Sequence, residues 1–337
     1  MDAHRRLLAV AAVAGVVATL AACASDDDEG GELDEPATIL DLTEFVDIDP
    51  GDVLSLRDDG AGGVEWIERR SGRVVTLPDI ARFFDEPASA DDVETIATID
   101  VIGADGEPPV GQRGLVGHTV IGDTRYAAWT DPDTDELLVG TVDDEPRIVW
   151  AGGGTDDGAV GGQLRPYVAD GTERLLLGIG QLTDWAQVND SGAMVTLDPA
   201  GPSDQEPRIV SDGYINPFAF DVTDDGSALW VADNAVGDDS ERIGRGDLLD
   251  RNGHSEVGGE NRAPAAMLEL DEATLLICGF LDGELQRWNV AGMSPARVDT
   301  VGPCLTAVAS VELGDHTDGT SVLVNATADA LVALPLP

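Results

Sequence analysis

The sequence contains no lysine, so all 19 of its basic residues are arginine, against 65 acidic residues and a formal net charge of −46. Nucleic-acid binding needs clustered cations that displace counterions from phosphates, and docking on an anionic membrane surface needs a basic patch. The composition therefore argues against both kinds of partner. A hydrophobic content of 42% is nevertheless enough to bury a core, so the acid excess does not by itself indicate disorder.

The N-terminal segment carries the clearest local signal. Residues 7–20 form an apolar run after Arg5 and Arg6 that is too short to span a bilayer as a mature helix. The run ends in the residues LAAC, which resemble the lipobox of bacterial lipoproteins with Cys23 as its cysteine. This resemblance implies cleavage before Cys23, a diacylglycerol on its sulfur and export from the cytoplasm. An ordinary signal peptide with a chance cysteine is the alternative.

These signals predict an order along the chain. We expect a signal peptide over residues 1–22, a lipidated cysteine with an acidic tether over 23–37, and a single folded domain over 38–337. The protein is then expected to be extracytoplasmic and anchored to the bacterial cell membrane through lipid on Cys23.

Cysteine is scarce, and lipidation of Cys23 leaves Cys278 and Cys304. An even pair in an oxidising compartment predicts a disulfide, with two buried free thiols as the alternative. Neither cysteine has a CxxC partner or a histidine cluster nearby, so a zinc site is not expected.

The folded part lacks any convincing apolar period of 3.6 residues and shows short apolar or β-branched runs instead. Asp-Gly pairs, which supply the positive φ values of tight hairpins, separate many of them. The runs that we predict as strands include 64–67, 73–77, 126–130, 137–142, 147–150, 175–179, 194–197, 218–222, 229–232, 274–278, 285–290, 308–313, 322–325 and 331–334.

The number of strands then predicts the architecture of this all-β chain. About 300 residues in strands of 4–6 give some two dozen strands, too many for one sandwich or small barrel. Radial repetition of four-stranded sheets accommodates them and leaves few exposed edges. We predict a six-bladed β-propeller, although five or seven blades fit the same periodicity.

Motifs of several common enzyme classes are absent, since the sequence has no GxSxG, Walker loop, HExxH or GxGxxG after a strand. Four other blocks are present, each with a counterpart of similar order and spacing in one family: 107–117 (EPPVGQRGLVG) with 126–130 (YAAWT); 161–164 (GGQL) with 175–180 (LLLGIG); 185–187 (WAQ) with 192–198 (GAMVTLD); and 216–220 (NPFAF) with 229–233 (LWVAD) and 239–241 (DSE).

Together these blocks resemble the glucose/sorbosone dehydrogenase family. Active members of that family are six-bladed propellers that use pyrroloquinoline quinone and calcium to oxidise sugars. The resemblance covers roughly residues 60–253. An unrelated propeller with similar turns is a further alternative.

The resemblance also implies roles for particular positions, and several of these have changed. The family's general base is a histidine, for which this chain has Ala159, and a side chain without a proton acceptor cannot abstract a proton. The family's arginine before Asn-Pro is matched by Ile215, and its Gly-Asp aspartate by Gln181. A tricarboxylated quinone needs cations, so its binding here is doubtful, although Gln163, Gln181 and Asn216 occupy cofactor-binding positions.

Histidine and acidic residues give the remaining candidates. His254, in a loop that faces the family's active end, is the best surviving candidate for a catalytic group, with a solvated loop histidine as the alternative, whereas His118 is expected to be a satisfied histidine in or near a strand. The resemblance places a calcium-binding loop at a set of oxygen-bearing residues, with solvated acidic turns as the alternative. These residues are Asp233, Asn234, Asp238, Asp239 and Glu241.

Two functions follow from these observations. The first is a cell-surface lipoprotein that binds a sugar or a protein at the end of its propeller without catalysis, or with an altered site. The second is a quinone-dependent sugar dehydrogenase, an oxidoreductase acting on CH–OH groups, with a rearranged active site. Convergence of arginines such as Arg113, Arg165 and Arg245 on the hub would favour the second, and an acidic or apolar funnel would favour the first.

Overall fold

A computed structural model shows the arrangement of the chain, which divides into two units, Met1–Gly31 and Glu32–Pro337. The structure describes part of the second unit: residues 33, 35–45, 51–102, 112–143, 145–155, 160–169, 171–180, 182, 192–223, 229–234, 241–246, 255–256, 262–292, 295–313 and 320–337. The first unit, with Arg5, Arg6 and Cys23, lies outside the described residues.

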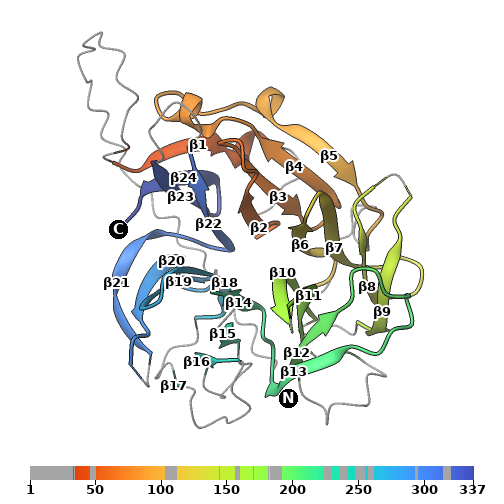
Figure 1. The fold of residues 1–337 in the computed structure, drawn as a ribbon. Coiled ribbons are helices and arrows are strands. Elements are labelled where there is room, and N and C mark those ends of the chain that lie inside the picture. Colours follow the sequence, from red (N-terminus) through yellow and green to blue (C-terminus); the bar gives the residue numbers. More distant parts are fainter. Residues whose placement is uncertain are drawn as a thin grey trace, which may run out of the picture. The chain divides into compact units, whose positions relative to one another are not determined.

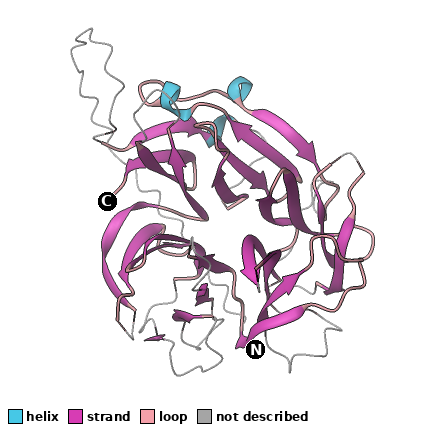
Figure 2. Ribbon diagram, viewed as in Figure 1, coloured by secondary structure: helices cyan, strands magenta, loops and turns pink. Residues whose placement is uncertain are grey.

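The second unit is built of six four-stranded antiparallel sheets (Figures 1 and 2), which confirms the predicted all-β, six-bladed propeller. In chain order, blade 1 has β2 (Val53–Asp58), β3 (Val64–Glu68), β4 (Arg73–Leu77) and β5 (Glu94–Thr98), and blade 2 has β6 (Leu115–Ile121), β7 (Thr124–Thr130), β8 (Glu136–Thr141) and β9 (Ile148–Gly154). Blade 3 has β10 (Gly161–Ala169), β11 (Thr172–Ile179), β12 (Gly192–Leu197) and β13 (Arg208–Tyr214), and blade 4 has β14 (Ala219–Val222), β15 (Leu229–Asp233), β16 (Arg242–Arg245) and β17 (Ser255–Glu256). Blade 5 has β18 (Pro264–Asp271), β19 (Thr274–Gly279), β20 (Glu284–Asn289) and β21 (Ala296–Pro303), and blade 6 has β22 (Ala307–Glu312), β23 (Ser321–Ala326) and β24 (Ala330–Pro335).

The fourth strand of blade 6 comes from the other end of the fold. Strand β1 (Ala37–Asp41) pairs antiparallel with β24, with Ala37 opposite Ala333 and Asp41 opposite Ala330. In Figure 1 the red β1 lies beside the blue β24. The ring is therefore closed by hydrogen bonds between the beginning and the end of the domain.

The core lies between the blades. The described residues form six apolar clusters, one at each contact between neighbouring blades. Alternation within a strand explains this, because successive side chains point to opposite faces of a sheet. In β11, Leu175 and Leu177 pack toward blade 2, whereas Leu176 packs toward blade 4. Middle strands such as β12 and β23 are therefore largely apolar, because both of their faces are buried.

Close approach of the inner strands requires glycine where blades 2 and 3 meet. A Cβ on Gly117 of β6 would lie 2.0 Å from the carbonyl oxygen of Gly162, and a Cβ on Gly162 would lie 2.2 Å from Cγ2 of Val116. Gly162 also has a φ of +99°, which side chains rarely adopt. Two of the sequence blocks that resemble the dehydrogenase family thus contain glycines that the packing of the ring itself requires.

Candidate functional site

One end of the hub is hollow. A cavity of about 210 Å³ opens where the inner strands begin and the second strands end. Leu54 and Val116 are the second residues of strands β2 and β6, whereas Asn234 follows β15 and Phe280 follows β19. The lining residues are Gly51, Leu54, Arg69, Gln112, Val116, Phe218, Asn234, Ala263, Pro264, Ala265, Phe280 and Thr306.

The wall of this hub cavity is mostly apolar. Its polar side chains are Arg69, Gln112, Asn234 and Thr306, and no acidic residue is among the described residues that line it. Thr306 contributes little polarity, because its hydroxyl donates a hydrogen bond to the carbonyl oxygen of Val53 at 2.5 Å. The cavity is therefore an apolar pocket with one cationic and two amide side chains in its described wall.

Gln112 is held by a chain of hydrogen bonds that starts in blade 4. Both Ile215 and Asn216 donate a backbone N–H to Oδ1 of Asp233, at 2.9 and 2.8 Å. Asn216 in turn donates its Nδ2 to Oε1 of Gln112 at 3.1 Å. Asn216 is buried and not among the lining residues, so its side chain acts in this structure by positioning Gln112.

Asp233 and Glu241, predicted as calcium ligands, both hold backbone that forms the cavity. Asp233 also forms an ion pair with Arg242. Glu241 accepts backbone N–H groups from Arg262 at 3.0 Å and from Ala263, which itself lines the cavity, at 2.5 Å. Burial raises the pKa of Glu241 although these hydrogen bonds act in the opposite direction. A cation would compete with N–H donors for both carboxylates.

The other predicted metal ligands either lie away from the carboxylates of Asp233 and Glu241 or fall outside the described residues. Asn234 lines the hub cavity, and Asp238 and Asp239 lie outside the described residues. Within the described ranges, no group of three histidine, cysteine or acidic residues is placed to hold a metal ion. Calcium binding stays a prediction.

The predicted catalytic and cofactor positions are only partly described. Ala159, Gln181 and His254 lie outside the described residues. Gln163 lies on β10, where it is 4% exposed, and it does not line the cavity. Of the candidates named from the sequence, the structure therefore brings Asn234 to the cavity and places Asn216 one hydrogen bond away from it.

The three arginines whose convergence would have favoured a quinone do not converge. Arg113 donates to Thr155 at 3.1 Å, Arg165 lies 3.4 Å from Asp221, and the guanidinium of Arg245 lies 5.5 Å from the ring centre of Trp230. None of them lines the cavity. The arginine that does, Arg69, was not identified from the sequence, because it lies in a turn between two strands of blade 1 without a recognisable motif.

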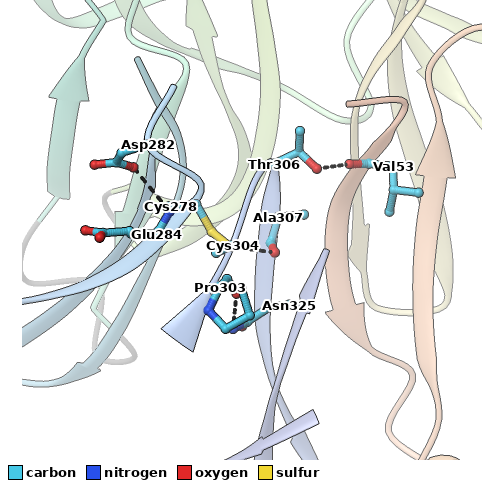
Figure 3. The surroundings of a disulfide bond; sticks show 9 residues. All are labelled: Val53, Cys278, Asp282, Glu284, Pro303, Cys304, Thr306, Ala307 and Asn325. Atoms are coloured by element: carbon cyan, nitrogen blue, oxygen red, sulfur yellow. Dashed lines mark hydrogen bonds between the residues drawn. A yellow bond between two sulfur atoms is a disulfide. The ribbon is translucent and has the colours of Figure 1, made fainter. Parts of the chain in front are cut away.

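A disulfide joins two segments of the cavity wall (Figure 3). Cys278 near the end of β19 is bonded to Cys304, with their Cα atoms 5.3 Å apart, so that blade 5 is linked to the segment that leads from β21 to β22 of blade 6. Phe280 and Thr306 each follow one of these cysteines by two residues. Closing a loop between residues 26 apart stabilises a protein by about 3–4 kcal/mol through the unfolded chain, and here it also fixes the spacing of two wall residues.

Comparison with solved structures identifies this fold. The chain superposes on the quinone-bound aldose sugar dehydrogenase of Streptomyces coelicolor with a TM-score of 0.60 and 14% identity, over 88% of this chain and 96% of that one. It has the propeller fold of the soluble sugar dehydrogenases. A glucose dehydrogenase matches with a TM-score of 0.62 and 16% identity, over 90% and 99% of the two chains. The apo aldose sugar dehydrogenase of Escherichia coli matches with 0.57 and 14%, over 88% and 98%.

These similarities establish the fold alone, because the sequence identities are only 14–16%. No family model and no curated protein matches the sequence of this chain.

The residues of the cavity do not fit pyrroloquinoline quinone. The quinone carries three carboxylates, and the described wall offers the single guanidinium of Arg69. The chain has no lysine, and Arg251 is the single arginine among those residues between 46 and 319 that the structure does not describe. At most two arginines are thus available for three carboxylates in an apolar cavity, where each unpaired charge is costly.

Proposed function

We propose that this protein is a binding module that holds a small ligand in its hub cavity and does not oxidise sugars. The observation that carries the proposal is the cavity wall, which is apolar, has no acidic residue in its described part and lacks the cations that a tricarboxylated quinone needs. Alanine at position 159, where the family has its general base, supports the same conclusion.

A dye-reduction assay tests the absence of sugar oxidation. The purified protein is incubated with pyrroloquinoline quinone and calcium, and dye reduction by glucose and other aldoses is followed. We expect no rate above that of quinone and calcium alone. The soluble aldose sugar dehydrogenase of Escherichia coli, treated identically, serves as the positive control. Turnover that saturates with sugar and requires this protein would overturn the proposal.

A quinone-dependent sugar dehydrogenase with a rearranged site is the second candidate. It is supported by the likeness to a quinone-bound dehydrogenase over 88% of this chain. His254 would then be the base, since it is the best remaining imidazole in a loop expected near the active end. In this case His254→Ala would abolish the turnover seen in the same assay.

We propose further that the module is anchored outside the cytoplasm through lipid on Cys23. Support comes from the sequence, where Arg5, Arg6 and an apolar run precede the lipobox-like residues. Among the described residues, none belongs to a helix long and apolar enough to cross a membrane.

Substitution of the cysteine tests the anchor. Cys23→Ala is expected to leave the signal peptide uncleaved at this site and to abolish labelling by a radioactive or alkyne-bearing fatty acid in bacterial cells. Ser25→Ala is the matched control, because it changes a residue of the predicted tether, keeps Cys23 and should keep the label. Equal labelling of the Cys23→Ala protein and the unmodified protein would contradict the anchor.

A further inference from the structure

The hub cavity is poor in charge although the chain is rich in it. The sequence has 65 acidic residues and 19 arginines, yet Arg69 is the single charged residue in the described wall of the cavity. Its Nε lies 3.4 Å from Oδ1 of Asp52, a buried carboxylate, so this guanidinium is already engaged in an ion pair. An ionic ligand would lose its hydration in an apolar cavity whose described wall offers it no dedicated counter-charge, and this loss is costly.

The amide of Gln112 is oriented as a hydrogen-bond donor in the wall. Its Oε1 accepts Nδ2 of Asn216 at 3.1 Å, and Asn216 is buried and not among the lining residues. The carbonyl end of the Gln112 amide is therefore turned toward Asn216, and its Nε2 end is the one that can donate to a ligand. The matching group on the ligand is an oxygen that accepts a hydrogen bond, and such an oxygen needs no charge.

Asn216 also fixes two other residues of the wall. Its carbonyl oxygen accepts the backbone N–H of Phe218 at 2.8 Å and that of Asn234 at 3.0 Å. Three lining residues, with Gln112 as the third, are thus held by one buried asparagine. A site whose donor and ring are positioned before binding loses less conformational entropy when a ligand enters.

The apolar part of the wall includes a ring that is incompletely covered. Leu54, Val116 and Phe218 are buried, whereas Phe280 is 44% exposed although it lines the cavity. Its ring lies over Gly51, where a Cβ would be 3.1 Å from Cε2 of Phe280. Covering an aromatic ring with an apolar group removes its surface from water, which favours a ligand with an apolar body.

We infer that the ligand of the hub cavity is an uncharged small molecule with an apolar body and one oxygen that accepts a hydrogen bond from Gln112. The body would pack against the aliphatic and aromatic side chains of the wall. A volume of about 210 Å³ is smaller than the ~300–1,000 Å³ of sites for drug-sized ligands, so it suits one substituted ring or a short branched chain. This inference rests on the proposed binding function.

The experiment compares four probes by isothermal titration on the unmodified protein at neutral pH. Benzamide, benzoate and benzamidinium have nearly the same shape and differ in charge, and acetamide has the amide without the ring. We expect benzamide to bind about ten-fold more tightly than either ion, because neither ion regains what it loses in hydration, and about ten-fold more tightly than acetamide. A buffer of high ionic strength screens the attraction of the acidic surface for benzamidinium.

A change of one amide to a carboxylate assigns the selectivity to Gln112. Gln112→Glu keeps an oxygen that accepts from Asn216 and replaces the donor with a second carboxylate oxygen. We expect this variant to bind benzamidinium more tightly than benzamide. Asn289→Asp is the matched control, because it makes the same exchange at an exposed residue that does not line the cavity, and it should keep the preference for benzamide.

A variant that fills the cavity locates the bound probe. Ala265→Phe adds a ring to a lining residue and should abolish binding of benzamide. Its melting temperature is measured as a check on folding. If this variant does not fold, the reversal expected for Gln112→Glu still decides whether the probe contacts the wall.

Every other outcome overturns the inference. Benzoate or benzamidinium binding as tightly as benzamide to the unmodified protein would show that the cavity does not select an uncharged ligand. An unchanged preference in Gln112→Glu, or benzamide binding that survives Ala265→Phe, would place the probe elsewhere. Failure of all four probes would reject this ligand class, and the dye-reduction assay would still decide separately whether the protein oxidises sugars.

Discussion

Replacing Leu40 by alanine is expected to lower the free energy of unfolding by about 2–5 kcal/mol, although Leu40 lies in the first strand, near the N-terminal end of the folded domain. Leu40 is fully buried in the apolar cluster that joins blades 6 and 1. It stands on β1 opposite Leu331 of β24. The substitution therefore leaves a void at the closure of the ring, where the two ends of the domain are held together without a covalent link.

Urea unfolding followed by tryptophan fluorescence measures this effect, and Thr38→Ala is the matched control. Thr38 lies on the same strand opposite Val332, but its side chain is exposed. Its removal should change the free energy of unfolding by less than about 0.5 kcal/mol. If Leu40→Ala and Thr38→Ala unfold at the same urea concentration, β1 does not close the ring as the structure shows.

Complete removal of residues 33–41 should have a still larger effect. It leaves the backbone groups of β24 without a partner on one side, on a strand whose residues read ALVALP. Such an exposed apolar edge pairs readily with other chains. We expect the shortened protein to lose its sharp unfolding transition and to form oligomers in size-exclusion chromatography.

This arrangement also connects the fold to the proposed anchor. The tether predicted over residues 23–37 leads directly into β1, which begins at Ala37. If Cys23 is lipidated, a pull on the anchor acts first on the strand that closes the ring.

The strands that could be predicted from the sequence are those buried on both faces. The run 73–77 is β4 as predicted, and 175–179 lies within β11. Strands at the inner and outer ends of the blades were harder to identify. β10 contains Gly161 and Gly162, where a Cβ would collide with neighbouring strands, and also Pro166. β21 is largely exposed and therefore has no apolar alternation.

The cavity could not be predicted, because its residues come from turns on several blades. Arg69, Gln112, Phe280 and Thr306 are far apart in the sequence, and only the ring brings them together. The acidic residues show why metal ligands are also difficult to predict from the sequence. Asp233 and Glu241 have the side chains of metal ligands, but the sequence does not reveal that backbone N–H groups are aimed at both carboxylates.

A buried ion cluster between blades 1 and 2 gives the second large expected effect. Glu65 on β3 is fully buried, and its carboxylate contacts Arg57 at 3.1 Å, Arg125 at 2.9 Å and Nε2 of His118 at 2.9 Å. His118 lies buried in strand β6, as expected from the sequence. Removing one partner of a buried ion pair leaves the others uncompensated, so Glu65→Gln should lower the free energy of unfolding by about 3–5 kcal/mol at neutral pH.

The pH dependence of stability follows from the same cluster. Burial alone would raise the pKa of Glu65, but the contacts with His118 and Arg125 and the charge of Arg57 outweigh it and lower the pKa from 4.5 to about 2. The resulting stabilisation, about 3 kcal/mol, is present above pH 4.5 and is lost as the pH falls toward 2. Burial lowers the pKa of His118 below 6.5 against the opposing effect of Glu65, so stability also decreases as the pH falls below 6.5.

Urea unfolding at pH 7, 5 and 3 separates the contribution of Glu65 from general acid effects. The difference in free energy of unfolding between the unmodified protein and Glu65→Gln should be largest at pH 7 and should shrink at pH 3, where the carboxylate in the unfolded chain is protonated. Glu94→Gln, on the exposed edge strand β5, is the control and should change stability little at each pH. A difference for Glu65→Gln that stays constant from pH 7 to pH 3 would show that its carboxylate is not held ionised by its neighbours, because only a lowered pKa makes the loss depend on pH.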